Sequence, residues 1–166
     1  MKIVMVLYPC PSGEAGEETP MEVLGCADKA LGLREWIEDQ GHELVTTTDT
    51  EGDELYEHLQ DAEVLITTPF WPVYATKEVL DQAPNLRLCI LAGVGSDNSD
   101  LAEARDRGIT GAEQSGSNIT RVAEHAVMQI LALVRNFMPA YNDVVEGGWS
   151  IGEIAAKSHD LEDKTV

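Results

Sequence analysis

A short glycine loop is the part of this sequence best suited to binding a ligand. In the stretch LCILAGVGSDNSDL, an apolar run ends at Ala92 and is followed by Gly-Val-Gly at residues 93–95. Backbone N–H groups at the carboxyl end of a parallel strand can form a concave anion-binding nest, and glycine lets a ligand approach closely. The loop can therefore hold a phosphate or a carboxylate. It can also be a plain strand-to-helix turn, with Ser96, Asp97 or Ser99 capping the next helix.

The spacing of this loop disfavours a nucleotide. A dinucleotide fingerprint places a third glycine three residues after the second, and here that residue is Asn98. About 20 positions further on, residues 116–120 offer no acidic side chain to hold a ribose. The sequence also has no G-x-x-x-x-G-K-[ST] motif. A small carboxylate is a better candidate ligand than a nucleotide.

Two other loops are expected at the same edge of the sheet. The stretch TTPFWPVY, with Pro69, Phe70, Trp71 and Tyr74, follows a third predicted strand, and its rings either line a pocket or cover the core. The stretch QSGSN follows a fifth strand and ends at Asn118, which either binds a ligand or simply caps a helix. Ligands of open α/β sheets sit outside the carboxyl ends of the strands, so these loops predict one small pocket.

Other chemistries find little support. Glu124 and His125 are adjacent, but no second ligand follows at helical spacing, so we expect no metal site. The sequence has no G-x-S-x-G elbow. Its three cysteines are widely spaced without a C-x-x-C pair, which predicts reduced thiols in a cytoplasmic protein. The apolar start, residues 3–8, is too short for a signal peptide, and no apolar run is long enough to span a bilayer.

The chain is strongly acidic. Eleven Lys and Arg against thirty Asp and Glu give a formal net charge of −19, spread along the sequence. This charge disfavours nucleic acid as a partner. Repulsion of this size destabilises a compact state in dilute buffer and is screened in strong salt. The protein therefore either comes from a salt-adapted (halophilic) source or is an ordinary acidic protein of the cytosol.

Short apolar runs alternate with helical patterns along the first two thirds of the chain. Strands are expected at residues 2–8, 42–48, 62–68, 86–92 and 108–112. Helices are expected at residues 24–40, 53–59, 76–83 and 100–108. Strands that are apolar throughout and alternate with helices predict an α/β fold, an open parallel sheet with helices on both faces.

The pattern changes after Asn118. One long helix is predicted for the stretch NITRVAEHAVMQILALVRNF. Its later part is apolar on nearly every face, so we expect this helix to be covered on more than one side. We therefore divide the chain into residues 1–118 and residues 119–166. The last two residues, Thr165 and Val166, are typical of the start of a further strand.

Two stretches of the chain carry a family pattern, PFWPVYATKEVLDQAPNLRLCILAGVGSDNSDL and SGSNITRVAEHAVMQILALVRNFMPA. Together they resemble NAD-dependent formate dehydrogenase of the D-2-hydroxyacid dehydrogenase superfamily. The resemblance covers nearly the whole chain. It implies a flavodoxin-like substrate-binding (catalytic) domain over residues 1–118. Residues 119–166 would then be a long interdomain and dimerisation helix and the lead-in to a truncated Rossmann coenzyme domain.

The resemblance also implies roles for individual residues. Pro69 and Phe70 would form an apolar wall, the Val94 N–H would hold one formate oxygen, and the Asn118 side chain would donate to the other. Asn118 would be the one catalytic residue within this chain. Arg121 and Val122 would lie near the coenzyme NAD. A homodimer would form through the helix between Thr120 and Met138.

Two departures from the family pattern concern the site. Asn98 and Ser99 replace a histidine and an aliphatic residue, and Arg121 replaces a small one. The coenzyme motif, the substrate arginine and the catalytic histidine are expected beyond Val166. As a fragment, the chain is expected to be inactive alone. The alternatives are a 2-hydroxyacid dehydrogenase of other specificity, or a stand-alone flavodoxin-like binding module.

Overall fold

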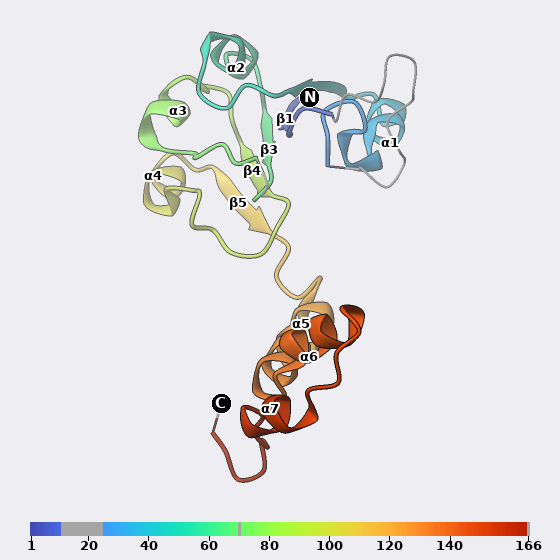
Figure 1. The fold of residues 1–166 in the computed structure, drawn as a ribbon. Coiled ribbons are helices and arrows are strands. Elements are labelled where there is room, and N and C mark those ends of the chain that lie inside the picture. Colours follow the sequence, from blue (N-terminus) through green and yellow to red (C-terminus); the bar gives the residue numbers. More distant parts are fainter. Residues whose placement is uncertain (11–24, 70, 166) are drawn as a thin grey trace, which may run out of the picture. The chain divides into compact units, whose positions relative to one another are not determined.

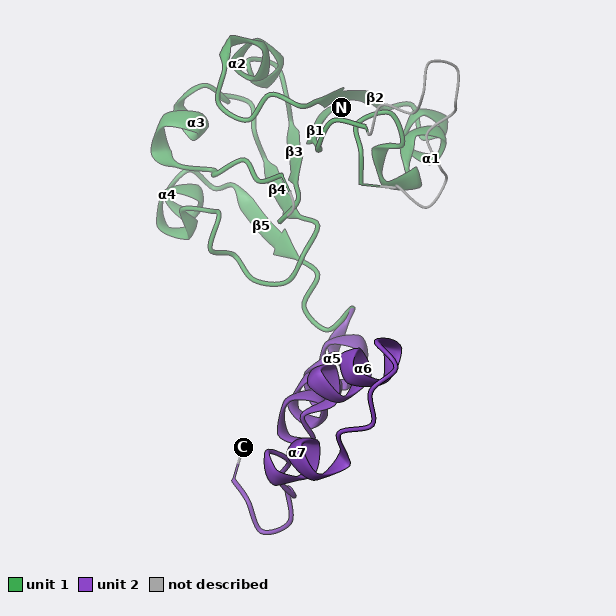
Figure 2. Cartoon of the chain, viewed as in Figure 1, with its two compact units in different colours: residues 1–117 green, residues 118–166 purple. Residues whose placement is uncertain are grey.

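A computed structural model describes residues 1–10, 25–69 and 71–165 of the chain. It forms two compact units, Met1–Ser117 and Asn118–Val166, which are coloured separately in Figure 2. The sheet and its helices belong to the first unit, and three further helices form the second. The two units are described separately.

The first unit alternates strands and helices, as the sequence predicts. Its elements, in order, are β1 (Lys2–Val6), the 3-10 helix η1 (Ala30–Gly32), α1 (Arg34–Asp39), β2 (Glu43–Thr47), α2 (Asp53–Leu59), β3 (Val64–Thr67), α3 (Lys77–Asp81), β4 (Leu88–Leu91), α4 (Leu101–Asp106) and β5 (Thr110–Glu113). The second unit contains α5 (Ile119–Val134), α6 (Phe137–Val145) and α7 (Ile151–Ala156).

The five strands form one parallel sheet in the order β2-β1-β3-β4-β5. This is the flavodoxin-like order, so the predicted α/β class is confirmed. Figure 1 shows α2, α3 and α4 on one face of the sheet and α1 on the other. Because all strands run in the same direction, the loops after β3, β4 and β5 emerge at one edge.

Two apolar cores lie on the two faces of the sheet. Alternate strand residues such as Val4, Val6 and Leu65 pack against α2, α3 and α4, and Leu55 and Leu59 are fully buried there. On the other face, the core is built from Ile3, Met5, Leu7, Ala30, Ile37, Leu44, Val64 and Ile66. The period-two alternation along β1 therefore supplies both cores, as expected for a sheet that is covered on both faces.

The first predicted helix is wrong over much of its length. Of the described residues in this range, 25–40, only Arg34–Asp39 forms an α-helix. Ala30, Leu31 and Gly32 have φ values of 47°, 57° and 72°, which are left-handed and interrupt a right-handed helix. The apolar spacing in this segment therefore reflects a tight turn followed by a short helix.

The long helix predicted from Asn118 onwards is also corrected. It ends at Val134, and a second helix begins at Phe137. Asn136 separates them with φ 53°, a left-handed conformation that asparagine tolerates better than most residues. No residue of α5 is buried, so the covering expected for its apolar faces stays a prediction. Within the described parts of both units, no helix is long and apolar enough to cross a membrane.

The expectation of three reduced thiols is wrong. Cys10 and Cys26 form a disulfide, and only Cys89 is a free, buried thiol. The backbone brings the two cysteines together, since Tyr8 forms a parallel bridge with Cys26 and the Ala27 N–H donates to the Tyr8 carbonyl at 3.1 Å. Sequence spacing could not show this contact, which depends on how the chain returns to the end of β1.

Candidate functional site

The loop after β3 is fixed by two buried threonines. The Thr67 hydroxyl accepts from the Val73 N–H at 2.9 Å, and the Thr68 hydroxyl accepts from the Trp71 N–H at 3.3 Å. The Trp71 indole N–H donates to the Thr48 carbonyl at 2.8 Å, which links this loop to the one after β2. One interpretation of the sequence was that this ring covers the core. Trp71 is instead 37% exposed, and its ring bridges two loops.

Pro69 packs directly on the glycine loop. Thr67 of β3 pairs with Leu91 of β4, so the segments that follow leave the sheet side by side. A Cβ added to Gly93 would lie 2.7 Å from Cγ of Pro69, much closer than van der Waals contact allows. Residue 93 therefore has to be glycine for this packing, which is a reason for the glycine that does not involve a phosphate.

A pocket of about 200 Å³ lies where these loops meet. Its walls come from the loops after β3 and β4 and include Pro69, Pro72, Tyr74, Leu91, Val94 and Asn98. The two loops are also joined by backbone hydrogen bonds, because the Ala75 N–H donates to the Asn98 carbonyl at 2.8 Å. The pocket is small and partly apolar, and it lies at the carboxyl edge of the sheet where ligands of such folds bind.

The end of β5 holds the glycine loop. The Gln114 N–H donates to the Gly93 carbonyl, and the Gly95 N–H donates to Oε2 of Glu113, each at 2.8 Å. The Val94 N–H, between these two contacts, donates to no acceptor in the part of the chain that the structure describes. Hydrogen bonds from the Ser115 side chain and from the Gly95 N–H lower the pKa of Glu113. The loop thus keeps the Val94 N–H free, while the next N–H along the chain is bound to a carboxylate.

The same geometry disfavours a dinucleotide at this loop. A pyrophosphate needs several free N–H groups, but the Gly95 N–H is already bound to a carboxylate. Asn98, in place of the third glycine of a dinucleotide motif, is a buried residue. Neither its amide nitrogen nor its oxygen has a hydrogen-bond partner among the described residues. The residues present here do not fit NAD.

The cap of α4 is not one of the three residues expected. The Asp100 side chain accepts from the Glu103 N–H at 2.9 Å, and Asp100 is the N-cap. Ser96, Asp97 and Ser99 therefore do not cap this helix. The plain-turn interpretation of the glycine loop loses that support.

The predicted site residues are only partly brought together. Pro69 and Val94 line the same pocket. Phe70 lies outside the described residues. Asn118 is the N-cap residue of α5 but makes no side-chain cap hydrogen bond, so its amide is not used as a plain cap. Asn118, Arg121 and Val122 belong to the second unit, all exposed, and their roles stay predictions.

Glu113 contacts the glycine loop, which the sequence analysis did not predict. The fifth strand was expected at residues 108–112, so Glu113 fell just beyond it, whereas β5 is Thr110–Glu113. A polar residue at the carboxyl end of a parallel strand is a signal that could have identified it. Its contact with Gly95, 18 residues away, is visible only in the folded chain.

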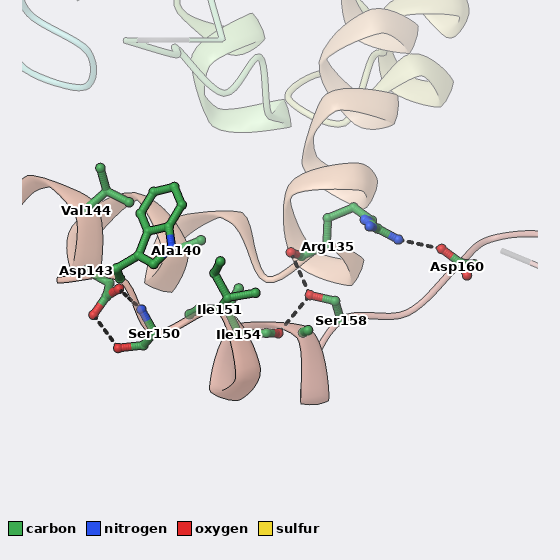
Figure 3. Close-up of a pocket in the computed structure, with 11 residues that line it drawn as sticks. Arg135, Ala140, Asp143, Val144, Ser150, Ile151, Ile154, Ser158 and Asp160 are labelled. Atoms are coloured by element: carbon green, nitrogen blue, oxygen red, sulfur yellow. Dashed lines mark hydrogen bonds and ion pairs between the residues drawn. The ribbon is translucent and has the colours of Figure 1, made fainter.

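The second unit has a hollow of its own, of about 490 Å³, shown in Figure 3. The Asp143 carboxylate accepts from the Ser150 N–H at 2.8 Å and from its hydroxyl at 2.9 Å. Arg135 pairs with Asp160, and the Ser158 hydroxyl donates to the Arg135 carbonyl at 3.0 Å. These polar groups form hydrogen bonds and ion pairs with one another, so their arrangement is explained by the structure of the second unit without a ligand. Within the described residues, no group of three or more His, Cys, Asp or Glu side chains is placed to hold a metal ion.

Comparison with known proteins agrees with the fold. The sequence profile described as "D-isomer specific 2-hydroxyacid dehydrogenase, catalytic domain" matches residues 27–158, most of the chain. The chain belongs to this family. It is also 48% identical to formate dehydrogenase of Candida boidinii over 170 aligned residues, which cover 100% of this chain and 46% of that protein. The resemblance to formate dehydrogenase is confirmed.

Two solved structures of this dehydrogenase family show the same architecture. A Granulicella formate dehydrogenase superposes with a TM-score of 0.81 at 39% identity, covering 97% of this chain and 50% of that one. The NAD-dependent formate dehydrogenase of Staphylococcus aureus, solved in complex with NAD, gives 0.79 at 42% identity, covering 97% and 46%. The chain spans about half the length of the relatives it matches.

Proposed function

We propose that this chain is the substrate-binding part of an NAD-dependent formate dehydrogenase. In this proposal, residues 1–118 bind formate, and residues 119–166 connect them to a coenzyme domain. The reaction is transfer of a hydride from the formate carbon to the nicotinamide, which releases carbon dioxide. The observation that carries the proposal is a small pocket lined by Pro69 and by Val94, whose N–H is unpaired among the described residues, in a chain 48% identical to a formate dehydrogenase.

The pocket suits formate chemically. Formate is a one-carbon carboxylate that only accepts hydrogen bonds at neutral pH, and an unpaired amide offers it a donor. Pro69 and Leu91 give the pocket an apolar side. Such walls exclude water and strengthen the hydrogen bond to the anion. Because formate carries no proton that has to be removed, catalysis needs positioning and electrostatics, and this chain supplies part of both.

Further parts of the proposal concern residues in the second unit. Asn118 would donate to the second formate oxygen, and its unused side chain supports this role. Arg121 and Val122 would lie near NAD. Because the glycine loop does not match a dinucleotide motif, we expect that motif in the half of the relatives that this chain does not match. The chain alone should therefore form no NADH from formate.

Two accompanying proposals concern environment and assembly. We place the protein in the cytoplasm; the Cys10–Cys26 disulfide is the observation that opposes this, since such bonds are rare there. We also propose a homodimer through α5 and the start of α6, supported by an apolar hollow that includes Val127, Met128, Leu131, Phe137 and Met138. Apolar surface of this kind is typical of interfaces.

Titration of the isotope-labelled chain with formate, followed by amide NMR, tests the proposed function. We expect a saturable shift of the Val94 amide, with amides of the β1 core unchanged. Val94→Pro removes the donor and should abolish binding, whereas Val94→Ala keeps the N–H and should retain it. The same titration with D-lactate tests the alternative specificity. A Val94 amide unaffected by molar formate, or tighter binding of D-lactate, would overturn the proposal.

A further inference from the structure

The glycine loop is held at both ends and left free in the middle. The Gly93 carbonyl and the Gly95 N–H are bound by two successive residues at the end of β5, Gln114 and Glu113. The first contact continues the parallel pairing of β4 with β5, in which Leu91 is opposite Glu113. The second is different in kind, because a side-chain carboxylate takes the place of a backbone acceptor.

The Glu113 contact fixes the peptide that follows Val94. Gly95 has φ 94°, a conformation that few residues other than glycine adopt and that gives the loop freedom to rearrange. A charge-assisted hydrogen bond to its N–H restricts that freedom. The pKa of Glu113 is lowered, first by the Ser115 side chain and then by the Gly95 N–H, so these hydrogen bonds favour the ionised carboxylate.

Glu113 acts on the loop without lining the candidate pocket. It borders a separate hollow of about 200 Å³, together with Cys89, Ser96, Ser99 and Ala112. The two hollows share only Leu91 among their lining residues. The Glu113 carboxylate therefore lines a different hollow from the one proposed for the anion.

We propose that Glu113 is a positioning residue for the carboxylate-binding loop. By holding the Gly95 N–H, it fixes the 94–95 peptide. That peptide adjoins the 93–94 peptide, which carries the Val94 N–H, so its restraint helps to keep Val94 in place at the pocket. The inference rests on the proposed function for its ligand, formate, but its structural part concerns the loop alone. Two opposing effects follow for any change at residue 113. Loss of the acceptor loosens the loop, and loss of the negative charge favours an anion nearby.

Three variants of the full chain separate these effects. Glu113→Ala removes both the acceptor and the charge, whereas Glu113→Gln removes the charge and keeps an acceptor. Glu57→Ala removes the same charge from an exposed position on α2 and is the control. Hydrogen exchange of the Gly95 amide reports on the loop, formate titration of the Val94 amide reports on binding, and thermal unfolding reports on the fold.

For Glu113→Ala, we expect Gly95 exchange to rise on the order of tenfold, the size expected for loss of a hydrogen bond to a charged group. Formate should bind several-fold more weakly than to Glu113→Gln, which should stay at or above the parent affinity. Glu57→Ala should match the parent in exchange at Gly95. All variants should keep a Tm close to the parent, because the contact is on the surface.

The inference would be overturned by unchanged Gly95 exchange in Glu113→Ala, or by formate binding to that variant as tightly as to Glu113→Gln. If formate shifts no amide of the parent chain, the proposed function fails. Gly95 exchange then still decides whether Glu113 holds the loop. A large fall in Tm for Glu113→Ala alone would assign the residue to stability and count against the inference.

Discussion

The ring of Pro69 and the backbone of Gly93 are in direct contact, so close that a Cβ at residue 93 would lie 2.7 Å from Cγ of the proline. This contact joins the loop after β3 to the loop after β4 and closes one side of the candidate pocket. Gly93→Ala should therefore force the two loops apart. We expect a loss of about 1–3 kcal/mol in the free energy of unfolding, measured by urea denaturation, as for other overpacked sites.

Two further variants check the cause of that loss. Gly111→Ala, in neighbouring β5, would bring a Cβ only to 3.7 Å from Leu101 and should cost much less. Pro69→Ala combined with Gly93→Ala should recover part of the stability, because the clashing ring atoms are gone. Strict additivity of the two changes would show that the residues do not interact.

The Cys10–Cys26 disulfide predicts the number of free thiols. Of three cysteines, only Cys89 should react with a thiol reagent when the chain is unfolded without reductant. Reduction should then lower the free energy of unfolding by roughly 2–4 kcal/mol, since the bond joins cysteines separated by 16 positions in the sequence. Cys89→Ser should show no free thiol before reduction. A count of three in the parent chain would contradict the bond.

Asp49 is expected to make the stability depend on pH. Its carboxylate accepts from the N–H groups of Gly52 at 2.8 Å and Leu55 at 3.0 Å, at the start of α2. The Leu55 N–H is the main cause that lowers its pKa below 3.8. A lowered pKa stabilises the fold above pH 3.8, and this stabilisation is lost as the pH falls through the pKa of the folded state.

Asp49→Ala should therefore cost about 0.5–2 kcal/mol at pH 7, the usual value of a helix-capping side chain. The loss should shrink in acid, where the parent carboxylate is itself protonated. Asp49→Asn keeps one acceptor oxygen and should lose less. Chemical denaturation between pH 2.5 and 7, on the order of the range in which carboxyl groups titrate, provides the measurement. An equal loss at every pH would rule out the ionised carboxylate as the cause.

The apolar hollow along α5 and α6 predicts self-association. Leu131 lines this hollow, whereas Leu133, two residues further along α5, does not and is 79% exposed. If α5 forms the dimer contact, Leu131→Glu should shift the chain towards monomer, and Leu133→Glu should leave the assembly unchanged. Light scattering at micromolar concentration distinguishes these results. A parent chain that is already a monodisperse monomer would exclude the homodimer.

The net charge of −19 predicts a response to salt. In dilute buffer, repulsion between the acidic groups opposes the compact state, and salt near 1 M reduces the screening length to about 3 Å. For a salt-adapted protein, Tm should rise markedly between low salt and molar KCl. A Tm that does not change would favour the alternative, an ordinary acidic protein.

The amino-acid sequence by itself determined the class of the fold. Apolar runs such as KIVMV alternate with helical patterns. That alternation depends on the local periodicity of the side chains, which can be read directly from the amino-acid sequence. Spacing also placed the glycine loop at a strand end and argued against a nucleotide because of Asn98. The loops after β3 and β4 share an edge because all five strands are parallel, a topological consequence of the same pattern.

Only the tertiary structure decided what depends on contacts between distant residues or on single backbone angles. The Gly95 N–H meets a carboxylate 18 positions later, and Cys10 meets Cys26 through the return of the chain to β1. One left-handed residue, Asn136, divides a helix that looks continuous in sequence. Periodicity averages over many residues, so it cannot register one torsion angle or one long-range hydrogen bond. Such contacts bind the Gly95 N–H to a carboxylate and leave the Val94 N–H without an acceptor among the described residues.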